Sequence, residues 1–138
     1  MVSTGPQKGQ YSLNSKEKAV LCAAYALEKK ALNVRILQVR ELSSITDFLL
    51  IASGTSDRQV QAVVESVRLG LKKNHQISPI ALEGVKEGRW ALIDYGDVMV
   101  HIFQQPVREF YDLDGLWSEA PEVDVPEKYG WERKTSSR

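Results

Sequence analysis

The segment 47–52 reads Asp-Phe-Leu-Leu-Ile-Ala and constrains the fold more than any other part of the chain. A strand with one solvated face alternates apolar and polar residues, whereas a short continuous apolar run is typical of a strand covered on both faces. Directly after this run, Ser56 and Gln59 predict a capping box, and apolar residues then recur at helical spacing up to Leu71. A buried strand that leads into an amphipathic helix predicts a layered α/β domain.

The remaining elements complete this pattern with a mixed sheet of about five strands. The expected helices are 15–30, 56–74 and 107–113. The expected strands are 34–40, 47–52, 80–82, 90–94 and 98–104. Asn14 and Glu17 predict a second capping box at the start of the first helix, and Pro106 stands where proline favours the start of the last one.

The length of 138 residues fits one domain. We expect that domain to span 15–118, between a flexible N-terminal extension, 1–14, and an acidic, proline-containing C-terminal tail, 119–138. The chain has no net charge, although residues 1–40 carry a net +5 and residues 109–138 a net −4. Because phosphate neutralisation dominates nucleic-acid affinity, a neutral chain argues against a free-standing DNA or RNA binder.

Several further classes are disfavoured by composition. A single cysteine excludes a disulfide framework and a cysteine-ligated zinc site, and two well-separated histidines argue against a clustered metal site. The longest apolar run, 19–27, has nine residues, whereas a membrane span needs about 20. The N-terminus has no apolar signal segment, so we expect a soluble intracellular protein.

A tight turn at Tyr95-Gly96 is expected to join the two clearest strands, with a four-residue loop as the alternative. A two-residue turn would place Trp90 opposite His101 and Asp94 opposite Asp97. One face of this hairpin is wholly aliphatic and should lie under helices, while the other mixes aromatic, charged and imidazole groups. Such a mixture is typical of a protein-binding surface, and a half-solvated sheet face is the plainer alternative.

The helix after Pro106 is expected to extend this surface. Arg108 and Tyr111 are neighbours on one helix face, and Arg and Tyr are enriched in interface hot spots. The alternative is that Tyr111 packs in the core and Arg108 is solvated. The candidate partner-binding residues are therefore Trp90, Asp94, Asp97, Met99, His101, Phe103, Arg108 and Tyr111.

Three features suggest a catalytic or ligand-binding site, and each also has a simpler structural explanation. Gly54-Thr55-Ser56 could cradle a phosphate at a helix N-terminus, but it lacks the known phosphate-loop patterns and is better explained as a cap. Asp94 and Asp97 could hold a divalent cation for nucleotidyl transfer, yet acidic residues are ordinary turn formers. Cys22 is expected to be a small buried hydrophobe. No nucleophile and no cofactor are indicated.

Several separated motifs resemble the ribosomal silencing factors, also called the Iojap family, in order and spacing over roughly residues 15–118. The motifs are Ser43-Ser44-Ile45-Thr46-Asp47-Phe48, Ser53-Gly54-Thr55-Ser56-Asp57-Arg58-Gln59-Val60, Glu83-Gly84, Trp90-Ala91-Leu92-Ile93-Asp94-Tyr95-Gly96-Asp97-Val98-Met99-Val100-His101-Ile102-Phe103, Arg108-Glu109-Phe110-Tyr111-Asp112-Leu113 and Leu116-Trp117. This resemblance implies a nucleotidyltransferase-like α/β fold without transferase activity. The resemblance assigns no catalytic residue to this sequence.

The resemblance also implies a function. Family members bind ribosomal protein fourteen of the large subunit, hinder joining of the small subunit when nutrients are short, and act in large-subunit maturation. Several are homodimers when free. We accordingly expect a non-enzymatic translational repressor of the bacterial cytoplasm, with no membrane and no DNA contact, whose acidic C-terminal third complements a basic ribosomal protein.

Two alternatives remain open. One is a magnesium-dependent nucleotidyltransferase-like enzyme that uses Asp94 and Asp97. The other is a module that binds ribosomal RNA directly through scattered basic side chains. Those basic residues are Lys29, Lys30, Arg35, Lys72 and Lys73.

Overall fold

The structure, a computed structural model, describes residues 13–125. Its helices are α2 (Ser15–Glu28), α3 (Asp57–His75), α4 (Gln105–Tyr111) and α5 (Leu113–Leu116). Its strands are β1 (Leu32–Gln38), β2 (Phe48–Gly54), β3 (Ala81–Glu83), β4 (Trp90–Asp94), β5 (Val98–Gln104) and β6 (Glu122–Val123). The α/β class is confirmed, and every strand expected from the sequence is present within a few residues of its expected place.

The six strands form one sheet in the order β3-β4-β5-β2-β1-β6. The two central strands, β2 and β5, are parallel, and all other neighbouring pairs are antiparallel, so the sheet is mixed. β2 is buried at all seven positions, as its continuous apolar sequence predicted. The sheet has one strand more than expected, because β6 falls in the segment predicted to be a tail.

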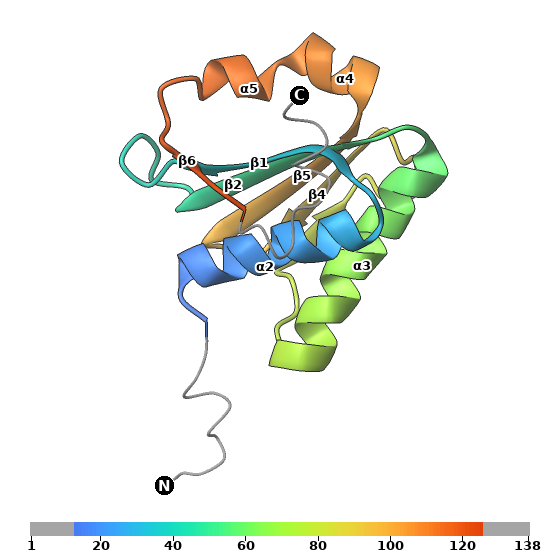
Figure 1. The fold of residues 1–138 in the computed structure, drawn as a ribbon, viewed down its shortest axis with the longest axis horizontal. Helices are drawn as coiled ribbons and strands as arrows, with labels where there is room; N and C mark the ends of the chain where they lie inside the picture. Colours follow the sequence, from blue (N-terminus) through green and yellow to red (C-terminus); the bar gives the residue numbers. More distant parts are fainter. Residues whose placement is uncertain (1–12, 126–138) are drawn as a thin grey trace, which may run out of the picture.

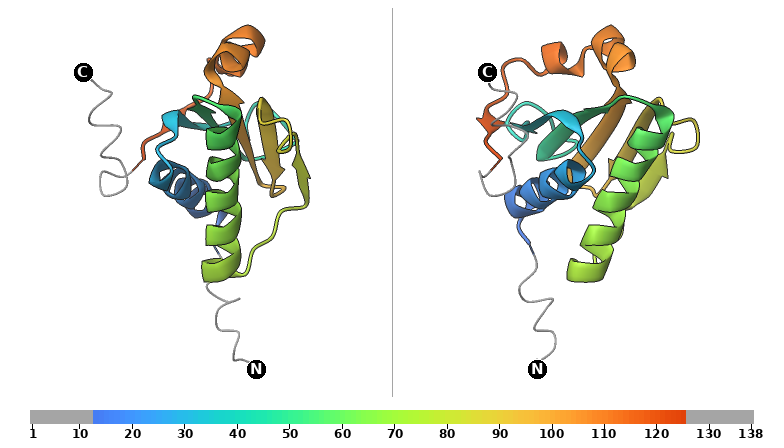
Figure 2. Two further views of the ribbon diagram at one scale, coloured as in Figure 1. Left: turned by 90° about the vertical axis from the view of Figure 1, so that its right-hand side faces the viewer. Right: turned by 45° about the vertical axis from the view of Figure 1, so that its right-hand side comes forward.

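Helices cover both faces of the sheet (Figure 1), with α2 and α3 on one face and α4 and α5 on the other. The buried face of α3 consists of Val60, Val63, Val64, Val67 and Leu71, the five residues predicted from helical spacing. Figure 2 shows α2 and α3 crossing on the same face. They approach closely where the Tyr25 ring lies against Gly70, because a Cβ at Gly70 would lie 2.6 Å from that ring.

The register of the β4–β5 hairpin differs by two residues from the expected one. Trp90 lies opposite Phe103, and Asp94 lies opposite Met99. Because side chains alternate across a strand, a shift of two residues keeps them on their expected faces. Trp90 and His101 therefore still share a face, but as diagonal rather than direct neighbours.

The turn itself explains the shift. Tyr95 continues the strand, buried, and its N–H donates to the carbonyl of Val98 at 2.9 Å. The two central turn residues are therefore Gly96 and Asp97 rather than Tyr95-Gly96. Gly96 has φ 89°, which favours glycine, and its N–H donates to Asp94 Oδ1 at 2.8 Å.

The C-terminal part of the described chain belongs to the domain, which extends past the expected boundary at residue 118. β6 pairs with β1, and Val125 is buried in the core beneath α2 and α3. The N-terminal extension up to residue 12 and the tail from residue 126 lie outside the described residues. Between residues 13 and 125, no helix is long and apolar enough to cross a lipid bilayer.

Candidate functional site

Four aromatic rings meet where β4, β5 and α4 come together. The Trp90 ring stacks on Phe103 with centroids 4.8 Å apart, contacts Tyr111 at 4.6 Å and lies 5.9 Å from His101. These residues differ in accessibility: Phe103 is fully buried, Trp90 and His101 are half-buried, and Tyr111 is 52% exposed. The structure therefore joins Tyr111 to the hairpin, as expected, but leaves no surface of Phe103 for a partner.

Two exposed apolar side chains on α4 and α5 were missed from the sequence. Phe110 is 80% exposed and packs edge-on against Tyr111, and Leu116 on α5 is 70% exposed. The sequence offered one signal for them, because both residues fall in the motifs that resemble the family. We define the aromatic surface as Trp90, Leu92, His101, Phe110 and Tyr111.

A hollow of about 270 Å³ opens beside Trp90 on this surface. Its lining residues are Glu83, Gly84, Trp90, Leu92 and His101. The indole Nε1–H of Trp90 donates to Nδ1 of His101 at 2.9 Å. Burial lowers the pKa of His101 to about 4, so the imidazole is neutral and accepts this bond at neutral pH.

This lowered pKa predicts a pH dependence of stability. The unfolded chain binds a proton at His101 near its ordinary pKa of 6.5, whereas the folded chain binds it only near pH 4. The free energy of unfolding should therefore fall as the pH drops from about 6.5 to 4, and His101→Asn should flatten that slope. Chemical denaturation of the wild type and of His101→Asn at several pH values checks this. An equal slope in the two proteins would contradict it.

Arg108 on α4 is 5% exposed, so it neither faces a partner nor is solvated. Its Nη1 donates to the carbonyl of Asn33 and to Ser53 Oγ, both at 2.8 Å. Its Nε and Nη2 donate to the two carboxylate oxygens of Asp114 at 3.0 and 2.8 Å. Asn33 lies at a bulge of β1 with φ 51°, a conformation that asparagine tolerates. The arginine expected on the functional surface instead fastens α4 to β1 and β2.

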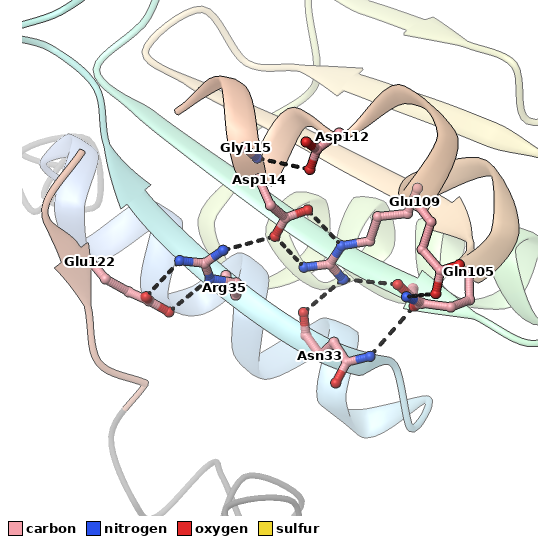
Figure 3. A network of polar contacts seen from close by, with 10 residues as sticks. Asn33, Arg35, Gln105, Glu109, Asp112, Asp114, Gly115 and Glu122 are labelled. Carbon is pink, nitrogen blue, oxygen red and sulfur yellow. Dashed lines mark hydrogen bonds and ion pairs between the residues drawn. The ribbon is translucent and has the colours of Figure 1, made fainter. Parts of the chain in front are cut away.

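The network continues from Asp114 through Arg35 to Glu122 on β6 (Figure 3). Asp114 also accepts from Arg35 at 2.9 Å, and Arg35 forms a forked pair with Glu122. Hydrogen bonds from Arg108 are the main cause that lowers the pKa of Asp114 to about 2. The basic N-terminal part and the acidic C-terminal part of the chain thus neutralise each other here.

The remaining three candidate residues do not join the aromatic surface. Asp94 is engaged by the turn, through Gly96. Asp97 forms an ion pair with Lys18 at 2.8 Å, and Lys18 belongs to α2 on the opposite face of the sheet. Met99 is half-buried in the smaller core under α4 and α5. The expected placement of Asp97 beside the aromatic residues is therefore corrected, because the turn residues do not follow strand alternation.

The turn before α3 is occupied by its own side chains. Ser56 Oγ accepts from the N–H of Gln59 at 3.1 Å, which confirms the cap. Gln59 does not close the expected box but accepts from the Thr55 N–H at 2.6 Å and donates to the carbonyls of Lys29 and Lys30. The N–H groups of Thr55 and Gln59 at this turn are therefore already engaged within the chain.

Replacing Ser56 with alanine should lower the free energy of unfolding by about 1 kcal/mol, because the N-cap is lost. The binding to large ribosomal subunits that the family resemblance implies should not change per folded molecule. Thermal denaturation and pelleting with large subunits measure the two effects, and Ser44→Ala on an exposed loop is the control. Weaker binding at an unchanged melting temperature would instead give this turn a binding role.

The basic residues considered for RNA binding lie apart. Lys29 and Lys30 lie beside the start of α3, next to Gln59, whereas Lys72 follows 13 residues later, about 20 Å along the helix. Arg35 is engaged by Glu122 and Asp114. This arrangement gives no continuous basic stripe along a phosphate backbone.

Comparison with known proteins places the chain in a family. Residues 12–138 match a family model described as "Ribosomal silencing factor during starvation". The chain is 36% identical to ribosomal silencing factor RsfS of Bacillus subtilis over 113 residues, which are 82% of this chain and 95% of that protein. It is also 29% identical to "Mitochondrial assembly of ribosomal large subunit protein 1" of Mus musculus, over 66% of this chain and 41% of that protein.

A solved structure agrees with this placement. A crystal structure of a Chromobacterium violaceum protein superposes with a TM-score of 0.74 at 30% identity, covering 86% of this chain and 100% of that one. The family model spans the whole described fold, and the bacterial relative covers most of both chains. The chain therefore belongs to the ribosomal silencing factor family.

Proposed function

We propose that this protein represses translation by binding the large ribosomal subunit through ribosomal protein fourteen, so that the small subunit cannot join. The observation that carries the proposal is the aromatic surface, with Phe110 and Tyr111 exposed beside the half-buried Trp90. Tryptophan and tyrosine in well-packed positions are the residues that most often dominate binding energy. On the opposite face the sheet is covered by α2 and α3, whereas on this face Trp90 and His101 remain half-buried beside α4 and can meet a partner.

Charge around the surface supports a basic partner. Glu83 lines the hollow, and Glu109 and Asp112 are exposed on and after α4. Asp114 and Glu122 are already paired within the chain, so they contribute less to attraction than the sequence suggested. Exposed acidic groups at the rim accelerate association with a basic protein and make it sensitive to salt.

Regulation without catalysis is part of the proposal. The bacterial relatives are named silencing factors, and the mouse relative is named for assembly of the mitochondrial large subunit, which supports a role in large-subunit maturation as well. Asp94 and Asp97 are engaged by different partners, which does not favour a shared metal site. We place this activity in the bacterial cytoplasm and expect a homodimer when the protein is free.

Sedimentation through sucrose gradients tests the proposal. Purified protein mixed with both ribosomal subunits should travel with the large subunit and reduce the peak of joined ribosomes. Large subunits that lack ribosomal protein fourteen should lose the protein. Sedimentation with the small subunit, or an undiminished joined peak at saturating protein, would refute the proposal. A thermal shift with ATP and magnesium would favour the enzymatic alternative, and salt-dependent binding to naked ribosomal RNA would favour the RNA-binding one.

A further inference from the structure

Trp90 is held from three sides on the aromatic surface. Phe103 lies under its ring at 4.8 Å, Tyr111 lies beside it at 4.6 Å, and His101 accepts its indole N–H at 2.9 Å. The first two contacts are apolar and impose no hydrogen-bond direction on the ring. The hydrogen bond is directional and fixes which edge of the indole points into the protein.

The bond also defines the protonation state and the tautomer of the His101 imidazole. Because Nδ1 accepts, the single proton of the neutral ring is on Nε2. A protonated imidazole would carry a hydrogen on both nitrogens and could not accept from Trp90. Burial among Trp90, Phe103 and the strand residues keeps the ring neutral.

We infer that His101 is a positioning residue for Trp90 and not itself a contact to the partner. It holds the indole in the orientation that contacts a partner. The conformational entropy of this side chain is therefore already lost in the free protein and is not lost again on binding. The inference rests on the proposed function, because it gives His101 a role in the same surface.

The geometry also restricts what a partner can offer to Trp90. The only polar hydrogen of the indole is already donated to His101, so a hydrogen-bond acceptor of the partner gains nothing there. The ring and the neighbouring Leu92 instead suit an aliphatic side chain, or the stem of a lysine or arginine whose charge lies near Glu83.

Substitutions at position 101 separate positioning from contact. His101→Leu removes the acceptor, and His101→Asn restores an acceptor near the position of Nδ1. The indole N–H of Trp90 is followed by NMR in the free protein, where Trp90→Phe identifies it among the three tryptophans. We expect faster solvent exchange of this proton in His101→Leu and near wild-type exchange in His101→Asn. His101→Phe is a second acceptor-free variant in case His101→Leu does not fold.

Binding to large subunits provides the second measurement. His101→Leu should bind about fivefold more weakly, which equals about 1 kcal/mol, and His101→Asn should recover most of that loss. In a Trp90→Phe background, His101→Leu should have no further effect, since the bond is already absent. His75→Asn is the matched control and should bind as the wild type does.

Three outcomes would overturn the inference. They are unchanged exchange and binding in His101→Leu, no recovery in His101→Asn, and a further loss of binding from His101→Leu in the Trp90→Phe background. The last result would make His101 a direct contact. If the wild-type protein does not bind large subunits at all, the proposed function fails, while the exchange measurement still decides whether His101 holds Trp90.

Discussion

Replacing Arg108 with methionine should lower the free energy of unfolding by about 3 kcal/mol, because it removes the donor to the Ser53 hydroxyl and the Asn33 carbonyl and leaves Asp114 paired with Arg35 alone. Methionine keeps much of the side-chain volume, so the loss reflects the four hydrogen bonds to Asn33, Ser53 and Asp114. Urea denaturation followed by circular dichroism measures the change.

Arg68 offers a matched control for this substitution. It forms the same two-armed pair with Glu65, at 2.8 and 3.3 Å, but on the exposed side of α3. Arg68→Met should therefore cost less than about 1 kcal/mol. An equal loss of unfolding free energy in the two variants would show that burial of Arg108 and its contacts to β1 and β2 contribute nothing to stability.

Trp90→Ala should remain folded and bind large ribosomal subunits at least about tenfold more weakly, because a central interface tryptophan commonly contributes about 2 kcal/mol or more. Losing the contacts with Phe103 and Tyr111 should also lower the free energy of unfolding by about 2 kcal/mol. The sequence alone did not predict these contacts. Binding must therefore be compared per folded molecule, by pelleting with large subunits alongside circular dichroism.

Tyr25→Ala is the control for truncation of a large aromatic side chain. Tyr25 packs against Gly70 between α2 and α3, on the face of the sheet away from the aromatic surface. It should lower stability and leave binding unchanged. Normal binding by folded Trp90→Ala would place the contact elsewhere, and the segment from Asp112 to Trp117 would be the next to test.

The sequence predicted those parts of the fold that depend on local periodicity. The continuous apolar run predicted that β2 is covered on both faces, and helical spacing predicted all five buried residues of α3. The faces of the β4–β5 hairpin were also predicted correctly. Its register was not, because one glycine with positive φ at Gly96 decides where the turn lies, and Tyr95 stood in the expected turn.

The features that were missed depend on partners far apart in the sequence. Arg108 donates to Asn33 and Ser53, which are 75 and 55 positions away, and no local sequence pattern predicts such contacts. β6 has only two residues and is held by β1 and by the Arg35–Glu122 pair, so its sequence carries no strand periodicity. Phe110 is apolar yet exposed, and its residue type alone does not distinguish an exposed position from a core position.

The parallel pairing of β2 with β5 has a consequence for how the chain folds. The two strands pair residues 50 positions apart, and closing a loop of that length costs about 3.5 kcal/mol beyond a constant. During synthesis β2 is complete long before β5 exists, so its apolar sequence has one permanent neighbour, β1, and one vacant edge. Folding should therefore be slow to nucleate, and the nascent or heat-opened chain should be most prone to aggregate through β2.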